Sequence, residues 1–356
     1  MKIRSLQARP VKVPMATPHR TASGTIESSP LVLVDVVAED GTRGQSIVFT
    51  YTPAALKPTA DFLRNLEPLV AGQPLAPAAL SEQLHARFRL LGTQGLVGMA
   101  LAGIDMALWD AQARAQGVGL HALLGAQPKK VACYGGVGYD GERDSARAAE
   151  AWARQGFKGV KAKVGYPTLA QDIAVVRAMR AAVGPDVALM VDYNQSLSPL
   201  EARARLAALD AEGLAWVEEP VLAHDFAGFV ELGQRAKTPL QAGENWWGPL
   251  DFRHAFNAGV RGHVMPDVMK CGGVTGWLAV SAMAQVYGAS VSSHLWPETS
   301  AQLLAATPTA RWLEYADWWN PVLQQPLAVR EGSADIEGVV GSGVAFDEAA
   351  VEKFAA

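Results

Sequence analysis

The chain has 356 residues, of which 49% are apolar and 19% are charged, with a formal net charge of −4. This composition predicts a globular protein long enough for two domains, and its mild acidity disfavours a nucleic acid or an anionic membrane as a partner. The two cysteines argue against a disulfide framework. The first fifteen residues lack an apolar core, and no apolar stretch has the length of a membrane span, so we expect a cytoplasmic protein.

The first 50 residues are predicted to form strands. Residues 3–13 alternate imperfectly between apolar and polar side chains, and the β-branched stretch 31–37 precedes a turn signal at 39–41. From about residue 53 to 117 the pattern is helical, most clearly over 99–115. Strands followed by helices indicate an α+β domain, to which we assign residues 1–127.

Seven short apolar stretches then each end in an ionisable residue, with 20 to 29 residues between successive ends. That spacing fits one strand plus one helix, the unit that joins parallel neighbours in a sheet. With a first strand at 131–134, it predicts an eight-stranded α/β barrel of the TIM type over residues 128–316, and a segment 317–356 that returns to the first domain. The seven stretches are 160–163, 188–192, 216–218, 240–244, 263–267, 291–294 and 312–314.

Two lysines lie on the first of these stretches. Lys161 and Lys163 are two residues apart on a strand, so both side chains point to one face. Inside a barrel, two neighbouring ammonium groups repel each other and lose water, and both effects are expected to lower a lysine pKa and provide a neutral base. The alternative interpretation is a solvated lysine pair at a strand edge.

Three acids, Asp192, Glu218 and Glu244, end three consecutive strands. Converging at the mouth of a barrel, they would repel one another unless a cation lay between them, and hard oxygen ligands favour Mg²⁺ or Mn²⁺. The alternative is a set of acids that cap helices or form salt bridges. Asn194 is expected to face the same pocket, whereas Glu219 is expected to point away from it as a structural partner for a helix.

The last strands carry a second candidate acid–base group. Asp267 and His294 end adjacent strands, and a carboxylate beside an imidazole fixes its tautomer and raises its basicity. Glu314 ends the final strand. If its surroundings keep it protonated, it could donate a hydrogen bond to a developing oxyanion; otherwise it is a surface acid.

With these positions placed, the chain resembles the enolase superfamily, and within it the mandelate racemase subgroup. The resemblance implies a (β/α)7β-type barrel with an α+β N-terminal capping domain, bound Mg²⁺ and a homo-oligomer. By the matching motifs, Asp192, Glu218 and Glu244 would be the metal ligands and Asn194 an accessory polar contact. The motifs lie at 51–53, 103–107, 160–167, 191–196, 243–246, 265–267, 272–277, 292–295 and 305–309.

The resemblance also implies catalytic roles. Lys163 would be the base for one face of the substrate, and His294, oriented by Asp267, would serve the other face. Glu314 would donate to a carboxylate oxygen as an enediolate forms. Lys161 would neutralise that carboxylate and depress the pKa of Lys163.

Substrate contacts are expected to depart from those of the subgroup. Where the subgroup has a serine that contacts the substrate, this chain has Gly136. The capping loop is apolar in the subgroup, whereas in this chain it carries His19, Ser23 and the charged Glu27. Trp246 and Trp247 follow pocket residues closely enough to line the site. The predicted substrate-binding residues are His19, Arg20, Ser23, Ile26, Tyr51 and Trp296.

We therefore expect an enzyme that abstracts the α-proton of an α-hydroxy carboxylate through a metal-stabilised enediolate. The polar loop favours dehydration of an acid sugar to a 2-keto acid. Racemisation or epimerisation of an α-hydroxy acid such as mandelate is the alternative, because the catalytic set is shared. A non-catalytic binding protein is disfavoured because every expected catalytic position is intact. A cycloisomerase or dipeptide epimerase is disfavoured because those relatives use lysines on two opposed strands.

Overall fold

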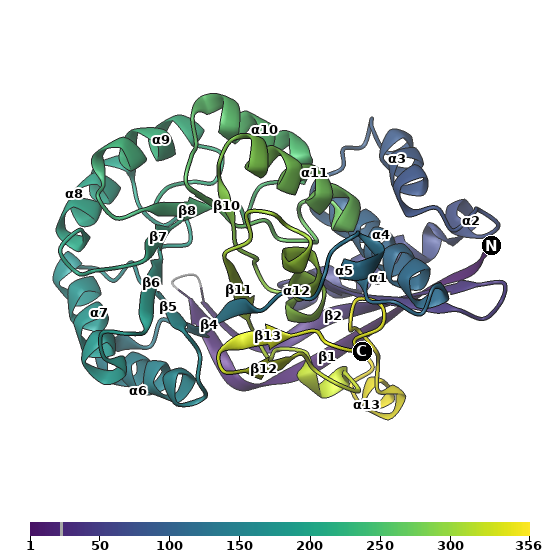
Figure 1. The fold of residues 1–356 in the computed structure, drawn as a ribbon, viewed down its shortest axis with the longest axis horizontal. Helices are drawn as coiled ribbons and strands as arrows, with labels where there is room; N and C mark the ends of the chain where they lie inside the picture. The colour runs from purple at the N-terminus through teal and green to yellow at the C-terminus, as the bar shows by residue number, and fades with distance from the viewer. Residues whose placement is uncertain (22–23) are drawn as a thin grey trace.

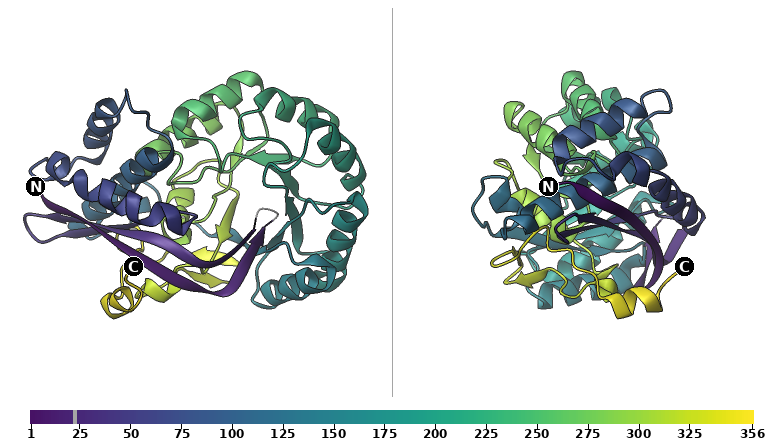
Figure 2. Two further views of the ribbon diagram at one scale, coloured as in Figure 1. Left: turned by 180° about the vertical axis from the view of Figure 1, so that it is seen from behind. Right: turned by 90° about the vertical axis from the view of Figure 1, so that its right-hand side faces the viewer.

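The computed structural model describes residues 1–21 and 24–356. The chain begins with an antiparallel three-stranded sheet in the order β1-β2-β3, formed by Ile3–Thr21, Gly24–Ala38 and Arg43–Phe49. The strand predicted at 3–13 continues to Thr21, because β1 stays paired with β2 beyond an irregularity between Pro14 and His19. This long pair extends to the open end of the barrel (Figures 1 and 2).

Five helices follow the sheet, and the longest of them packs on it. Gly103 on α4 lies so close to β3 that an added Cβ would be 2.5 Å from Val48 Cγ2, so only glycine fits there. Strands and helices together form the predicted α+β capping domain. The helices are α1 Pro53–Asn65, α2 Glu67–Val70, α3 Pro77–Arg87, α4 Gly95–Ala115 and α5 Leu120–Leu123.

Eight parallel strands form a closed barrel. Neighbours in sequence pair in order from β4 to β10, and β11 pairs with β4 in parallel to close the ring. The pairings of β9 with β8 and β10 are short, and an isolated bridge between Val291 and Ala310 joins β10 to the segment that leads into β11. The strands are β4 Val131–Val137, β5 Gly159–Lys163, β6 Ala188–Asp192, β7 Trp216–Glu218, β8 Leu240–Ala242, β9 His263–Val264, β10 Ser290–Val291 and β11 Trp312–Tyr315.

One helix follows each of the first seven barrel strands, which confirms the (β/α)7β arrangement (Figure 1). The strands β8, β9 and β10 end earlier than predicted, because the chain turns before the charged residue is reached; Gly243, for example, has a φ of 136°. The barrel helices are α6 Gly141–Arg154, α7 Leu169–Val183, α8 Pro199–Leu209, α9 Phe226–Arg235, α10 Gly248–Ala258, α11 Gly273–Val286 and α12 Pro297–Ala305.

The C-terminal tail contacts both units. After the 3-10 turn η1 (Asn320–Val322), the hairpin of β12 (Ala328–Arg330) and β13 (Ser333–Asp335) adds to barrel strand β4 in antiparallel fashion. The last helix, α13 (Glu348–Lys353), brings the chain end to the first sheet, where the Lys12 N–H donates to the Phe354 carbonyl at 2.9 Å.

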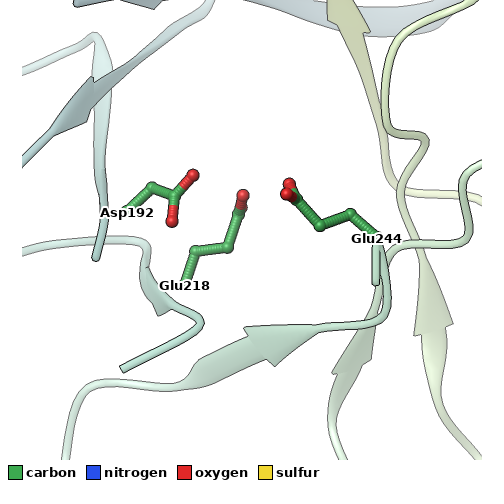
Figure 3. Close-up of side chains that lie close together, drawn as sticks. All are labelled: Asp192, Glu218 and Glu244. Carbon is green, nitrogen blue, oxygen red and sulfur yellow. The ribbon is translucent and has the colours of Figure 1, made fainter. Parts of the chain in front are cut away.

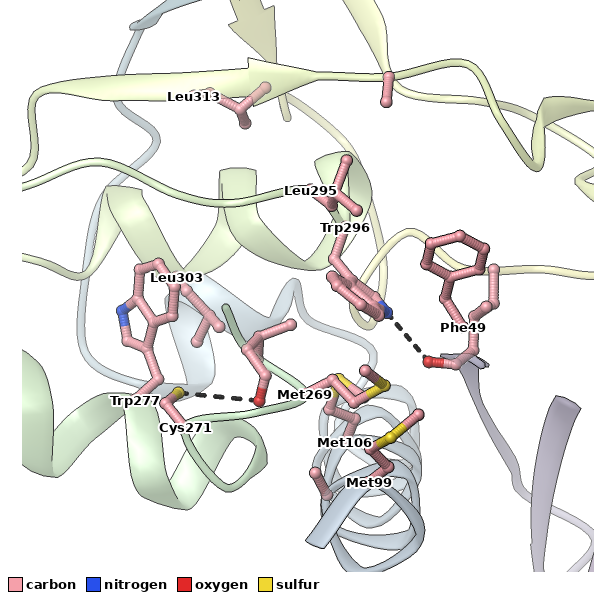
Figure 4. Close-up of a cluster of buried hydrophobic side chains, with 14 of the residues drawn as sticks. Phe49, Met99, Met106, Met269, Cys271, Trp277, Leu295, Trp296, Leu303 and Leu313 are labelled. Carbon is pink, nitrogen blue, oxygen red and sulfur yellow. Dashed lines mark hydrogen bonds between the residues drawn. The ribbon is translucent and has the colours of Figure 1, made fainter. Parts of the chain in front are cut away.

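Buried side chains join the capping domain to the barrel (Figure 4). The Trp296 indole donates to the Ile47 carbonyl at 2.9 Å, and Met99 and Met106 of α4 lie in the same apolar cluster. Beside this cluster, buried Asp105 accepts hydrogen bonds from both the N–H and the hydroxyl of Thr275 at the start of α11. The capping domain is therefore held against the ends of the barrel strands. Within the described residues, no helix is both long and apolar enough for a membrane span.

Candidate active site

The three predicted metal ligands converge. Asp192 and Glu218 are the last residues of β6 and β7, and Glu244 lies two residues beyond β8. Each offers a carboxylate oxygen within 4.8 Å of the others, and all three side chains are buried (Figure 3). Glu244 Oε2 is buried without a hydrogen bond among the described residues. Because three hard anionic oxygens meet with an unsatisfied lone pair, the residues fit a divalent cation such as Mg²⁺.

Asn194 holds one of these acids in place. Its N–H donates to Asp192 Oδ1 at 2.7 Å and its side-chain amide to Oδ2 at 3.0 Å. Glu219 was predicted to point away from the site, but this prediction is wrong. Its carboxylate accepts two hydrogen bonds from the side chain of Asn245, the residue next to Glu244. The prediction assumed strand alternation, whereas the backbone at Glu219 leaves the strand with a φ of 40°.

Lys161 and Lys163 point to the same face, among these acids. Lys161 donates to Glu218 Oε1 at 2.5 Å and to Glu314 Oε1 at 2.8 Å, and Lys163 donates to Asp192. Burial lowers the pKa of each lysine, but the neighbouring carboxylates raise it further, and the net pKa lies above the ordinary value. Lys161 does lower the pKa of Lys163, as predicted, but the predicted net lowering is wrong for both lysines, because it left out the neighbouring acids.

His294 and Asp267 form the predicted pair. His294 Nδ1 donates to Asp267 Oδ2 at 2.7 Å, and the backbone N–H groups of Met269 and Lys270 hold Asp267 Oδ1 at 2.8 and 3.0 Å. Burial lowers the pKa of His294, but Glu244 and the bond to Asp267 raise it, and the net pKa is above the ordinary value. The imidazole is thus oriented and basic, with Nε2 directed toward the acids.

Glu314 is ionised rather than protonated. Burial raises its pKa, but Lys161, His294 and Lys163 outweigh this effect and lower the pKa to about 2. The condition for a protonated carboxyl is therefore not met in this arrangement, because a buried acid beside Lys161 and Lys163 keeps its charge. Glu314 Oε2 also accepts the Leu295 N–H at 3.1 Å.

A cavity of about 390 Å³ opens between the barrel and the capping domain. Lys163, Asn194, Glu244 and His294 lie on its barrel side. Its other walls are mainly apolar and come from segments far apart in the sequence. They include Ile26, Phe49, Met99, Trp247, Leu295 and Trp318.

The predicted substrate-binding residues divide between the cavity and its surroundings. His19, Ile26 and Tyr51 line the cavity, and His19 packs on Trp318 with ring centroids 4.9 Å apart. Burial and Lys163 lower the pKa of His19 to about 4, so its imidazole is neutral. Arg20 pairs with Asp140 at 3.1 Å and lines a neighbouring cavity that Lys163 and His294 also line. Ser23 lies outside the described residues.

The tryptophan predictions were only partly right. Trp296 does not face the cavity, because its indole is buried and donates to Ile47. Trp246 is likewise buried and donates to the Ala223 carbonyl at 2.9 Å, whereas Trp247 does line the cavity. Trp318 was missed, although it follows the last strand by only three residues.

A second, more polar cavity of about 590 Å³ shares His19, Lys163 and His294 with the first. It continues past Gly136 toward Asp140 and other polar side chains. A Cβ at Gly136 would meet no atom within 4 Å, so this glycine leaves the passage open.

Comparisons with known proteins place the chain in a family. Residues 3–125 match the N-terminal domain of the mandelate racemase / muconate lactonizing enzyme family, and residues 144–350 match the enolase C-terminal domain-like family. The chain belongs to the mandelate racemase / muconate lactonizing enzyme family of the enolase superfamily. The resemblance inferred from the motifs is thereby confirmed.

Several relatives of this family member have been solved or characterised. An enolase from Bradyrhizobium, complexed with magnesium and mandelic acid, is 43% identical, with a TM-score of 0.96 over 100% of this chain and 98% of that one. A magnesium-bound enolase from alpha proteobacterium BAL199 is 38% identical, with a TM-score of 0.97 over 100% of this chain and 99% of that one. The L-talarate/galactarate dehydratase of Salmonella typhimurium is 28% identical over 95% of this chain and 87% of its own length.

These findings establish the class of protein. The chain is a lyase or isomerase of the enolase superfamily, and its cofactor is Mg²⁺. The homo-oligomeric state and the cytoplasmic location stay predictions.

Proposed function

We propose that this enzyme racemises an α-hydroxy carboxylate that carries an aromatic or similarly apolar group. The observation that carries the proposal is the apolar wall of the 390 Å³ cavity, which lies directly beside Lys163 and His294. Such a wall favours an apolar substituent by removing its surface from water. The mandelic acid bound by the Bradyrhizobium relative is an acid of this kind.

Two bases on different barrel strands support proton exchange at one carbon. Lys163 on β5 takes the α-proton from one face of the substrate, and His294, after β10, returns a proton to the opposite face. In the reverse direction the two residues exchange roles. Asp192, Glu218 and Glu244 would hold Mg²⁺, which would supply positive charge to stabilise the enediolate and would offset the charge of Asp192 that raises the pKa of Lys163.

The remaining residues prepare the substrate carboxylate. Lys161, which is buried and cationic, neutralises it as negative charge develops. Glu314 is ionised in the enzyme without substrate. A substrate carboxylate placed beside it raises the pKa of Glu314, because two neighbouring negative charges disfavour ionisation. We therefore assign to Glu314 a proton that it takes from solvent when the substrate binds, donates to the enediolate oxygen, and takes back when the carboxylate re-forms.

Two polar residues of the loop that favoured dehydration face a candidate substrate site: His19 lines the 390 Å³ cavity, and Arg20 lines the 590 Å³ cavity. His19 pairs with Ile26 across β1 and β2, and both line the 390 Å³ cavity. Their sequence neighbours Arg20 and Glu27 do not line the 390 Å³ cavity, because side chains alternate along a strand. Glu27 is exposed and lines neither cavity. Neutral His19 can still bind a hydroxyl group on the substrate's ring.

Dehydration of an acid sugar is the second candidate. It is favoured by the polar 590 Å³ cavity and by the similarity to the L-talarate/galactarate dehydratase. In this reaction Lys163 removes the α-proton, and His294 protonates the β-hydroxyl, which leaves as water to give a 2-keto acid after tautomerisation. The substrate would extend past Gly136.

The test is to incubate the Mg²⁺-loaded enzyme with each enantiomer of mandelate and with a panel of sugar acids. Mandelate has no β-hydroxyl and cannot lose water in this way. The proposal expects optical rotation of each mandelate enantiomer to decay to zero. No change with mandelate, together with 2-keto products from sugar acids, would replace racemisation by the second candidate.

A further inference from the structure

Lys270 is a buried lysine that the proposed reaction does not use. It is only 8% exposed and lines the 390 Å³ cavity. Its ammonium donates to Asn245 Oδ1 at 2.7 Å and lies 4.6 Å from the centre of the Tyr51 ring. A buried charge is costly unless it is paired, so these two contacts suggest a purpose at this position.

On one side, Lys270 fixes the orientation of an amide beside the metal site. An ammonium group has only donors, so Asn245 must present its oxygen to Lys270. The amide nitrogen then faces Glu219, at 3.0 and 2.8 Å, and Glu244 Oε1, at 3.1 Å. Without Lys270, the amide could rotate and release the carboxylate of Glu244.

On the other side, Lys270 reaches the acid–base pair. Its backbone N–H donates to Asp267 Oδ1 at 3.0 Å, a bond that any residue here would keep, so the side chain acts on the pair through Tyr51. Tyr51, under the ammonium, donates its hydroxyl to Asp267 Oδ2 at 3.2 Å, and that same oxygen accepts from His294 at 2.7 Å. His294 Nε2 in turn lies 3.3 Å from Glu244 Oε2. The contacts form a closed ring from Glu244 through Lys270 and back.

We propose that Lys270 is a positioning residue that holds Glu244 in its ligating orientation and the Asp267–His294 pair in its proton-transferring orientation. The part that concerns His294 rests on the proposed function, whereas the part that concerns Glu244 requires only that the three acids bind Mg²⁺. Outer residues of this kind commonly change metal affinity by about 10- to 100-fold.

The test is Lys270→Met, which keeps length and apolar contact but removes the charge and its hydrogen bond. Loss of a positive charge near the three acids by itself favours Mg²⁺, so weaker binding reports the lost orientation of Glu244; we expect calorimetric titrations without substrate to show about 10-fold weaker binding than in the unmodified enzyme. Lys57→Met is the matched control, since Lys57 is an exposed helical lysine paired with Asp61. An unchanged Mg²⁺ affinity in folded Lys270→Met would overturn the proposal.

Two further variants separate positioning from general destabilisation. Asn245→Leu should weaken Mg²⁺ binding by a similar factor, and the double variant should be no weaker than either single one, because both act through the same amide. Additive losses would contradict that path. If Lys270→Met does not fold, Lys270→Gln provides the same comparison.

Proton exchange tests the second half of the proposal. With saturating Mg²⁺, deuterium entry from the face served by His294 should fall more in Lys270→Met than entry from the face served by Lys163. Equal losses on both faces would overturn the link to His294. If the unmodified enzyme exchanges no proton in any hydroxy acid, the proposed function fails, while the Mg²⁺ titration still decides the role at Glu244.

Discussion

Replacing Asp267 by asparagine should disable one of the two bases and leave the other. In the structure, the backbone N–H groups of Met269 and Lys270 both donate to Asp267 Oδ1. In Asp267→Asn the amide oxygen must take that place, because these two buried donors need an acceptor. The new NH₂ group then faces His294 Nδ1, which can only accept from it. The ring proton moves to Nε2, and His294 can no longer receive a proton there.

The size of the effect follows from the loss of the correct tautomer. A comparable Asp-to-Asn change beside a catalytic histidine lowers turnover about 10⁴-fold. At about 1.36 kcal/mol per factor of ten, this corresponds to about 5.4 kcal/mol of transition-state stabilisation. The loss should be confined to proton abstraction by His294. Lys163 approaches from β5 and makes no contact with Asp267, so abstraction by Lys163 should fall far less.

The assay is NMR-detected loss of the α-proton of each mandelate enantiomer in D₂O. Asp267→Asn should still exchange the enantiomer whose proton faces Lys163, while exchange of the other falls by about 10³- to 10⁴-fold. Asp186→Asn, at an exposed aspartate, is the control and should match the unmodified enzyme. Similar exchange of both enantiomers, or equal loss of both, would refute the assignment of two separate bases.

Three other outcomes follow from the structure. Glu218→Gln removes one of three charged ligands and should weaken Mg²⁺ binding at least about 10-fold by calorimetry, with activity restored by excess metal only in part. Burial raises the pKa of Asp105 to about 7, so the stability it contributes is complete below about pH 4 and is lost as pH rises through 7. Denaturant unfolding at pH 5 and pH 8 should therefore show a decline in the unmodified protein, of about 3 kcal/mol, that Asp105→Asn lacks. Gly276→Ala should lower the melting temperature, because its Cβ would lie 1.9 Å from the Cys271 carbonyl oxygen, whereas Gly233→Ala, with 3.8 Å to its nearest neighbour, should not.

The barrel could be predicted from the sequence because its signals are local. β6 and β7 have the bounds expected at 188–192 and 216–218, since each apolar run ends sharply at a charged residue. The start of α8 is equally local: Ser198 and Glu201 cap each other's backbone N–H groups. The convergence of the three acids follows from strand order alone, because parallel strands deliver their ends to one rim.

Features that depend on distant partners could not be predicted in this way. The ionisation of Lys163 and Glu314 is decided by charges from several strands, whose distances no spacing reveals. The apolar cavity wall joins Phe49, Met99 and Trp318, which only the docking of the capping domain brings together. The position of Arg20 outside the 390 Å³ cavity, by contrast, follows from strand alternation once β1 is known to continue to Thr21.

The most direct test of the central claim is deuterium incorporation from D₂O into both enantiomers of mandelate by the Mg²⁺-loaded enzyme, followed by mass spectrometry and chiral chromatography. The account predicts that either enantiomer becomes a racemic mixture carrying one deuterium at the α-carbon, with no loss of water from any substrate of this type. Unlabelled, unracemised mandelate, recovered from an enzyme preparation that converts a sugar acid to its 2-keto product, would contradict it.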